Sequence, residues 1–239
     1  MCYAARMKAG KNERRRALVI AAHPDDPEYG CAGTVARWAA EGAEITYLLL
    51  TSGDKGTKNP SVRPGRLAAL REKEQAQAAA QLGVSDLVFL RRPDGMLENT
   101  MELRRELVGL IRQRKPHSVF AIDPWRHYQT HPDHRAAGLA ALDAIYAAKE
   151  VNLFAEQLVR GVEPWRVKEV YLFWTDAPDH WVDISGSINR RIAALLRHSS
   201  QVGKDSKGHD TWTRNLSRET ARKAGLACEY AEAFKLLKI

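Results

Sequence analysis

The chain has 239 residues, of which 44% are hydrophobic and 28% are charged. This length is enough to bury an independent core, and this composition excludes the collagen-like, coiled-coil and small disulfide-stabilised classes. The formal net charge is +8, but residues 1–16 carry +5 and residues 197–223 carry +4, which leaves the rest of the chain at −1. Because the body has no basic excess and no apolar run near the roughly 20 residues of a membrane helix, we expect a globular protein that binds neither nucleic acid nor membranes.

The N-terminal segment and the cysteines indicate where in the cell the protein is expected. Residues 1–16 form a basic arm that is expected to be disordered. They contain no apolar segment before Ala17, so we do not expect them to be a secretory signal. Cys2, Cys31 and Cys228 are an odd and scattered set, which predicts neither a disulfide framework nor a thiolate metal site. A reducing compartment suits such cysteines, and we therefore expect a cytoplasmic protein.

Short aliphatic runs alternate with amphipathic stretches from Ala17 onward. The runs predicted to form strands are 17–22, 44–50, 86–90, 118–122 and 169–174. The stretches predicted to form helices, in which apolar residues recur every three or four positions, are 33–41, 66–82, 101–115, 133–149 and 184–198. Residues 199–214 are polar and rich in glycine, serine and lysine, which predicts a long loop.

This alternation of strands and helices predicts an α/β fold. Right-handed crossovers would join the strands into a mostly parallel sheet with helices on both faces. We expect a single domain, residues 17–239, built as a Rossmann-like three-layer sandwich with strand order 3-2-1-4-5 and a small C-terminal extension. In that order the first and fourth strands are neighbours, and the chain leaves them in opposite directions, which opens a crevice at their carboxyl ends.

Two motifs rich in metal-ligand residue types open into this crevice. HPDDPE, residues 23–28, follows the first strand, and HPDH, residues 131–134, follows the fourth. A single His-Pro-Asp motif is most often a turn or a helix cap, but two of them at the ends of neighbouring strands favour a functional site. Two histidines and one carboxylate with an open fourth position form a catalytic zinc arrangement, in which the metal lowers the pKa of its water to about 7 and polarises a carbonyl. The motifs therefore predict metal-dependent hydrolysis.

Four segments of the chain resemble the PIG-L/LmbE family of zinc-dependent N-acetylglucosaminyl deacetylases. They are AHPDDPEYGCAGTVARWAAEGAEITYLLLTSGDKGT, RLAALREKEQAQAAAQLGVSDLVFL, PDGML and HPDHRAAG. The resemblance runs from about Ala17 to Gln201 and includes both histidine motifs in the family's order. It implies that His23, Asp26 and His134 bind zinc.

The resemblance leaves the other polar residues of the two motifs free for catalysis. It implies that Asp25 is the general base, because a carboxylate bound to zinc loses much of its basicity whereas an unligated neighbour can take a proton from the bound water. Protonated His131 is implied to stabilise the oxyanion or to give a proton to the leaving amine. Two roles stay open for Asp133. It either holds His131 in the useful tautomer as a second-sphere residue that does not bind the metal, or it is a carboxylate that stabilises the helix N-terminus.

Two further residues resemble positions at which family members hold sugar hydroxyls. Arg71 lies in an RxxE segment, and Asp94 lies in a PDG turn. The alternatives are an exposed helix charge paired with Glu74 for Arg71, and a turn residue before Gly95 for Asp94. Arg191 stands where the family commonly has lysine, and because arginine and lysine differ in geometry and hydration, a substrate contact is not carried over to it.

The leading hypothesis is a zinc-dependent hydrolase that removes the acetyl group from an N-acetylated amino sugar of the N-acetylglucosamine type, by attack of zinc-bound water on the amide. Fe²⁺ also suits two histidines and one carboxylate. The alternatives are an amidase for another amide, such as a sugar–thiol conjugate, and a non-catalytic Rossmann-like protein that binds a carbohydrate or a nucleotide. Nucleotide binding is disfavoured because HPDDPE stands where GxGxxG would bind a pyrophosphate. The expected partner is a small N-acetylated sugar, and a homo-oligomer is left open.

Overall fold

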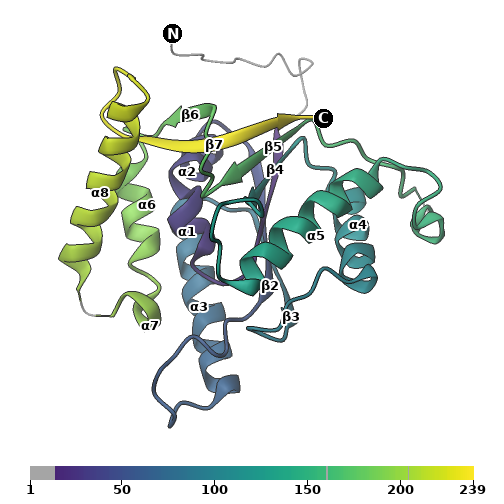
Figure 1. Cartoon of the computed structure of the whole chain (residues 1–239), viewed down its shortest axis with the longest axis horizontal. Coiled ribbons are helices and arrows are strands. Elements are labelled where there is room, and N and C mark those ends of the chain that lie inside the picture. The colour runs from purple at the N-terminus through teal and green to yellow at the C-terminus, as the bar shows by residue number, and fades with distance from the viewer. Residues whose placement is uncertain (1–13, 160, 204) are drawn as a thin grey trace.

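The computed structural model describes residues 14–159, 161–203 and 205–239, and within them a seven-stranded sheet forms the middle layer (Figure 1). The strands are β1 (Arg16–Ala21), β2 (Glu44–Thr51), β3 (Asp86–Arg92), β4 (Ser118–Ile122), β5 (Glu169–Phe173), β6 (His180–Asp183) and β7 (Ala231–Lys238). They are arranged in the order β3-β2-β1-β4-β5-β7-β6. The first five strands pair in parallel, and β7 runs antiparallel to both β5 and β6. The predicted order 3-2-1-4-5 is confirmed, with two antiparallel strands added beside β5.

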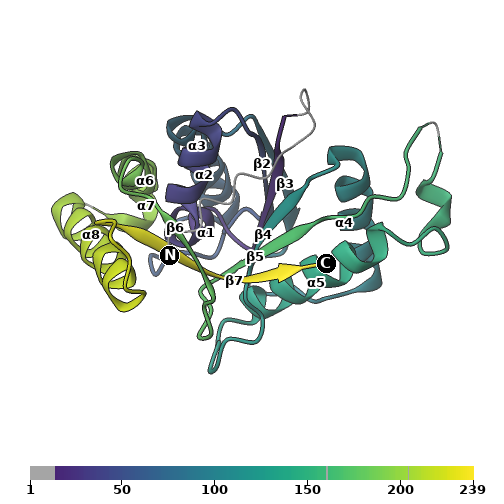
Figure 2. The same cartoon turned by 90° about the horizontal axis from the view of Figure 1, so that it is seen from above.

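Helices cover both faces of this sheet (Figure 2). They are α1 (Asp26–Gly30), α2 (Ala32–Ala40), α3 (Pro64–Leu82), α4 (Met101–Arg114), α5 (Pro132–Ala148), α6 (Ile188–Leu195), α7 (Ser199–Val202), α8 (Ser206–Lys223) and a short 3-10 turn, η1 (Ala155–Gln157). α1, α2, α3 and α6 lie on one face, α4 and α5 pack together on the other, and α8 contacts β7 and α6. The predicted three-layer α/β sandwich is therefore confirmed. Among the described residues, no helix has the length and apolar character needed to cross a membrane.

β1 and β4 lie in the middle of the sheet, and their sequences explain why. RALVIA in β1 and SVFAI in β4 are nearly continuous apolar runs, as expected for strands that are covered on both faces. Their register places Val19 opposite Phe120 and Ile20 opposite Ala121. The two strands therefore end side by side, and the loops that follow them leave from the same edge of the sheet.

The predicted N-terminal arm, residues 1–16, lies outside the described residues as far as position 13. Its last residues contact the domain. The guanidinium carbon of Arg15 lies 3.2 Å from the centre of the Trp38 ring, and its Nη2 lies 3.4 Å from Glu169 Oε2. Arg16 is the first residue of β1, one position earlier than predicted. The basic residues at this end of the arm thus have partners on the folded body.

Most of the segment that is predicted to be a loop, residues 199–214, is helical instead and forms α7 and the first half of α8. The buried positions of α8 are Thr213, Ser217 and Ala221, which recur every four residues. Two of these three are polar, so the pattern of hydrophobic residues does not reveal the helix. The prediction of a loop is wrong because small polar side chains, and not apolar ones, form most of the buried face of this helix.

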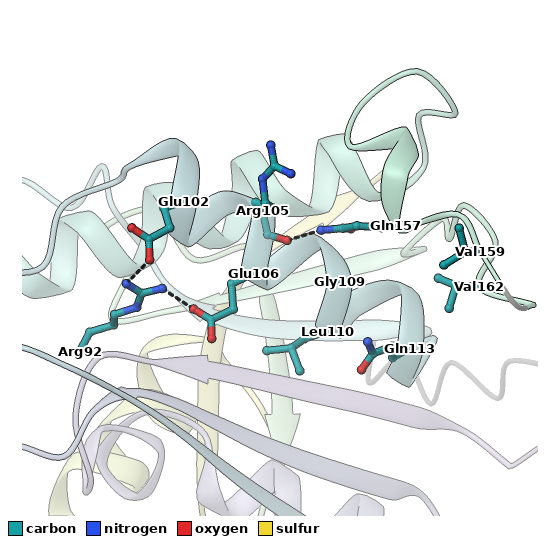
Figure 3. Close-up of a pocket in the computed structure, with 10 residues that line it drawn as sticks. All are labelled: Arg92, Glu102, Arg105, Glu106, Gly109, Leu110, Gln113, Gln157, Val159 and Val162. Atoms are coloured by element: carbon teal, nitrogen blue, oxygen red, sulfur yellow. Dashed lines mark hydrogen bonds and ion pairs between the residues drawn. The ribbon is translucent and has the colours of Figure 1, made fainter.

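A surface groove of about 660 Å³ runs along α4 beside Gln157 (Figure 3). Several of its polar side chains are paired with one another or with the backbone. Arg92 lies 2.8 Å from Glu102 and 2.6 Å from Glu106, and Gln157 donates to the backbone carbonyl of Arg105 at 2.8 Å. None of the predicted site residues lines this groove, and the candidate site lies instead where β1 and β4 end.

Candidate active site

Two loops bring the candidate site residues together at the carboxyl ends of β1 and β4. The HPDDPE motif follows β1 and runs into α1, and the HPDH motif opens α5, where a proline suits the first turn. The ring centroids lie 4.8 Å apart for His23 and His131, 4.3 Å for His131 and His134, and 5.3 Å for His23 and His134. The predicted meeting of the two motifs is therefore confirmed.

Asp26 lies between His23 and His134, and these three residues are the predicted metal ligands. Asp26 Oδ2 lies 3.4 Å from His23 Nδ1, and Oδ1 lies 3.4 Å from His134 Nε2. Two donors that each bind zinc at about 2.0 to 2.1 Å in a tetrahedral arrangement lie about 3.4 Å apart, so the spacing fits one metal ion. The donor atoms of His23, His131 and His134 also lie within 4.8 Å of one another. His131 is therefore a second candidate for the ligand set.

The side chains around His23 carry an excess of negative charge. Burial alone would lower the pKa of this histidine, but the carboxylates of Asp26, Asp133 and Asp94 raise it to about 12. Burial raises the pKa of Asp26, but the facing imidazoles of His23 and His134 hold it well below its ordinary value. A group of side chains that stabilises positive charge this strongly suits a divalent cation, which would take the place of the proton.

Asp133 is directed at His23. Its Oδ2 lies 3.1 Å from His23 Nε2, and its two oxygens accept hydrogen bonds from the N–H groups of Gly95 at 2.7 Å and Leu97 at 3.1 Å. The prediction that Asp133 holds His131 is therefore wrong, because the loop after β3 fixes this carboxylate behind His23. A carboxylate in that place sets the tautomer and orientation of a metal-binding histidine.

Asp94 contacts the same nitrogen of His23. Its Oδ1 lies 3.1 Å from His23 Nε2, and its Oδ2 accepts a hydrogen bond from the Lys55 backbone N–H at 2.7 Å. Burial raises the pKa of Asp94, but His23 and the Lys55 N–H bring it down to about 2. Gly95 follows with a φ of 77°, so the predicted turn is present as well. Both carboxylate oxygens have a protein partner, and contact with a sugar hydroxyl stays a prediction.

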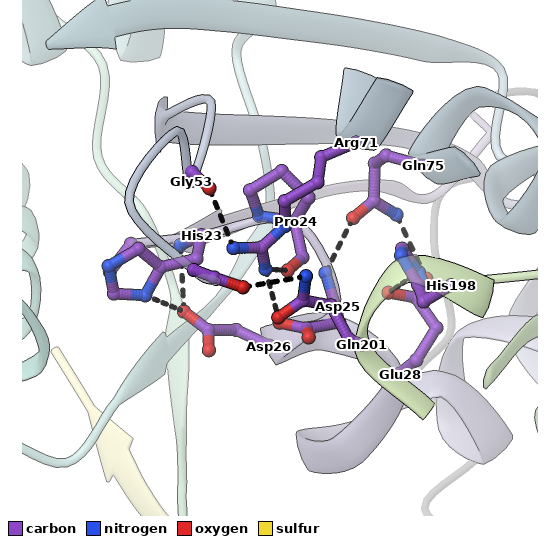
Figure 4. A network of polar contacts seen from close by, with 12 residues as sticks. His23, Pro24, Asp25, Asp26, Glu28, Gly53, Arg71, Gln75, His198 and Gln201 are labelled. Atoms are coloured by element: carbon purple, nitrogen blue, oxygen red, sulfur yellow. Dashed lines mark hydrogen bonds and ion pairs between the residues drawn. The ribbon is translucent and has the colours of Figure 1, made fainter. Parts of the chain in front are cut away.

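Asp25 lies beside the predicted ligands in an unusual backbone conformation (Figure 4). Its φ of 90° and ψ of −26° fall in the left-handed region, which residues other than glycine rarely adopt. Its carbonyl accepts hydrogen bonds from the N–H groups of Glu28 at 2.9 Å and Tyr29 at 3.1 Å. Burial raises the pKa of Asp25 to about 7, against the lowering effect of Arg71. A carboxylate with a pKa near neutrality suits a general base.

Arg71 holds this turn in place. Its Nη2 lies 3.2 Å from Asp25 Oδ1 and donates to the Pro24 carbonyl at 2.5 Å, and its Nη1 donates to the Gly53 carbonyl at 3.0 Å (Figure 4). The residue is only 4% exposed. The alternative of an exposed charge paired with Glu74 is therefore wrong. The predicted contact with a sugar stays a prediction.

Gly53 leaves room for this arginine. Its φ is 63°, and an added Cβ would overlap the Arg71 guanidinium. We expect Gly53→Ala to lower the free energy of unfolding by about 2 kcal/mol and to lower kcat, because Arg71 would be pushed away from Asp25. Urea unfolding and a turnover assay measure the two effects. Gly65→Ala is the matched control, since nothing lies within 4 Å of its added Cβ, and equal losses in both variants would contradict the explanation.

Three buried residues behind Asp25 are absent from the predicted site. His198 Nε2 lies 3.1 Å from Glu28 Oε2, and Gln75 bridges Glu28 and the Asp25 backbone. Burial lowers the pKa of His198, but Glu28 raises it above its ordinary value overall. One signal was available, since Gln75 follows Arg71 by four residues on the same face of a helix.

Arg191, at the position where the family commonly has lysine, supports α1 from the interior. It donates to the carbonyls of Glu28 at 3.3 Å and Tyr29 at 2.7 Å, and its Nη1 lies 3.3 Å from Glu232 Oε1. The side chain is buried among these partners. Its role in this structure is to hold the last turn of α1.

Comparison with known proteins identifies the family of the chain. The family model PIG-L, described as GlcNAc-PI de-N-acetylase, matches residues 18–145, which include both histidine motifs. The chain is 36% identical to diacetylchitobiose deacetylase of Thermococcus kodakarensis, over 81% of this chain and 73% of that protein. It is 35% identical to the probable N-acetyl-alpha-D-glucosaminyl L-malate deacetylase 2 of Bacillus anthracis, over 80% of this chain and 83% of that protein.

A solved structure extends the likeness to nearly the whole chain. The N,N'-diacetylchitobiose deacetylase of Pyrococcus horikoshii, in complex with its inhibitor MPG, superposes with a TM-score of 0.88 at 31% identity. The superposition covers 95% of this chain and 85% of that one. The family model and these relatives show that the chain belongs to the PIG-L family.

Proposed function

We propose that this protein is a metal-dependent hydrolase that removes the acetyl group from an N-acetylated amino sugar. The observation that carries the proposal is the position of Asp26 midway between His23 and His134, at 3.4 Å from each, with the carboxylate of Asp25 left beside them. The names of the two relatives, both deacetylases of N-acetylglucosamine derivatives, support the choice of substrate class.

His23, Asp26 and His134 would hold the metal, which we propose to be zinc, although the same donors suit Fe²⁺. When bound, the metal would polarise the amide carbonyl and lower the pKa of a water molecule to about 7. Asp133 and Asp94, both 3.1 Å from His23 Nε2, would keep the other nitrogen of that histidine directed at the metal position.

Asp25 would move the proton. With a pKa of about 7 it accepts a proton from the attacking water and then returns it to the amine nitrogen as the carbon–nitrogen bond breaks, which releases acetate and the amino sugar. Burial and the charges of His134 and His23 lower the pKa of His131. This favours the neutral imidazole over the protonated form that the resemblance implies. His131 would then donate a hydrogen bond to the oxyanion of the tetrahedral intermediate.

Release of primary amine tests the proposal. We expect release from at least one of N-acetylglucosamine, diacetylchitobiose and an N-acetylglucosaminyl inositol or malate. Chelation should abolish the release and added zinc should restore it, because the carbonyl is no longer polarised without the metal. A protein that holds one metal ion per chain and releases no amine from any of these substrates would contradict the proposal.

A further inference from the structure

The backbone of Asp25 cannot hold its conformation by local preference alone. A φ of 90° at a residue that carries a Cβ persists only where the surroundings impose it, and such strain gathers at functional sites. Its carbonyl is bound by the first turn of α1, and its carboxylate is bound by Arg71. The remaining polar group of the residue is its backbone N–H, which donates to Gln75 Oε1 at 2.9 Å.

Gln75 comes from α3, 50 positions along the chain, and its side chain is fully buried. The amide of a glutamine can be turned over, so that its NH₂ group would face the Asp25 N–H and the hydrogen bond would be lost. Glu28 prevents this. Its Oε1 accepts a hydrogen bond from Gln75 Nε2 at 3.0 Å, and a carboxylate in this place can only accept. One orientation of the amide therefore satisfies both neighbours.

Glu28 is itself held by His198. The Glu28 Oε2 lies 3.1 Å from His198 Nε2, and both side chains have no exposed surface. His198 lies at the start of α7, in the C-terminal part of the chain. Figure 4 shows Gln75, Glu28 and His198 on the opposite side of Asp25 from His23. These residues thus reach Asp25 from behind, away from the predicted metal ligands.

We propose that Gln75 is a positioning residue that sets the backbone of the general base, and that the Glu28–His198 pair sets the orientation of Gln75. The inference rests on the proposed function of Asp25. It assigns to α3 and to the start of α7 a part in catalysis through a chain of hydrogen bonds that runs from His198 to Glu28, to Gln75 and to the Asp25 N–H.

Gln75→Leu tests the first link. We expect kcat to fall about 100-fold, because a misplacement of a catalytic group by about 1 Å costs that much. KM and metal content should stay near the wild-type values, because the side chain is fully buried and its hydrogen bonds join Asp25 and Glu28, which are not among the predicted metal ligands. Gln77→Leu is the matched control, since Gln77 lies on the exposed face of the same helix. A kcat within about threefold of wild type for Gln75→Leu would overturn the proposal.

An exchange of partners tests the chain of hydrogen bonds. Gln75→Glu alone places a second carboxylate against Glu28, and we expect a loss of kcat similar to that of Gln75→Leu. In the double variant Gln75→Glu/Glu28→Gln, the new carboxylate accepts from the Asp25 N–H and from the new amide, which in turn accepts from His198. We expect kcat to recover about 10-fold over Gln75→Glu, as coupled positions require. A double variant no better than either single variant would overturn this part.

Hydrogen–deuterium exchange separates this inference from the proposed function. The peptide that spans residues 23–30 should exchange faster in Gln75→Leu than in wild type or in Gln77→Leu, whether or not a substrate is known. Equal exchange in all three proteins would overturn the positioning role even for an active enzyme. Faster exchange in Gln75→Leu, together with a wild-type protein that releases no amine, would instead support the positioning role and reject the deacetylase function.

Discussion

Asp25→Asn is expected to lower kcat for amine release by about 10³-fold, within the range that a general base contributes. The substituted side chain has nearly the same size but cannot accept a proton. Asparagine is also among the residues that tolerate the left-handed backbone found at this position, where φ is 90°. The fold of the turn should therefore survive, and the loss should fall on kcat.

The metal content of Asp25→Asn distinguishes a base from a ligand. We expect it to equal that of the wild type by elemental analysis, because Asp26, His23 and His134 supply the donors. Asp54→Asn, in the loop after β2 at the same edge of the sheet, serves as the control for general effects of removing a negative charge. Turnover of Asp25→Asn within about threefold of the control would show that another group takes the proton. Loss of the metal would make Asp25 a ligand.

His134→Ala is expected to lose both metal and activity, whereas His131→Ala is expected to keep the metal and lose about 10² to 10³ in kcat, the effect of removing one oxyanion donor. The reason is geometric. His134 Nε2 lies 3.4 Å from Asp26 Oδ1, as two ligands of one ion would. His131 stacks on His134, with ring centroids 4.3 Å apart.

The two variants decide between the two candidate ligand sets, since the donor atoms of all three histidines lie within 4.8 Å of one another. Elemental analysis and amine release would be measured on the same preparations. His127→Ala is the control, because this histidine is on the loop after β4 and its side chain is 81% exposed. If His131→Ala lost the metal and His134→Ala kept it, the assigned roles of the two histidines would be exchanged.

Local sequence patterns are sufficient to predict a helix or strand whose buried residues are apolar and recur with a regular period. The runs that form β1 and β4 are buried on both faces, so their composition alone identifies them, and the order 3-2-1-4-5 is the one expected of a doubly wound sheet. The same patterns do not predict α8, because its buried face includes the polar residues Thr213 and Ser217. A polar residue in a helix interior has no signature until the surface that buries it is known.

The two histidine motifs were likewise evident in the sequence, because their residue types and their places after neighbouring strands are local facts. The partners of Asp133, Arg71 and Gln75 were not. Asp133 stands between His131 and His134 in the sequence, but the loop after β3, through the N–H groups of Gly95 and Leu97, turns its carboxylate toward His23.

The α/β architecture, the edge of the sheet at which the site lies, and the chemical types of its donors can all be predicted from local patterns in the amino-acid sequence. Which donor faces which partner depends on tertiary packing, as in the contact between Gln75 and Asp25 across 50 positions. A buried polar group must find a hydrogen-bond partner among whatever groups the packing brings near it. That choice depends on the positions of several elements at once, and no local pattern contains it.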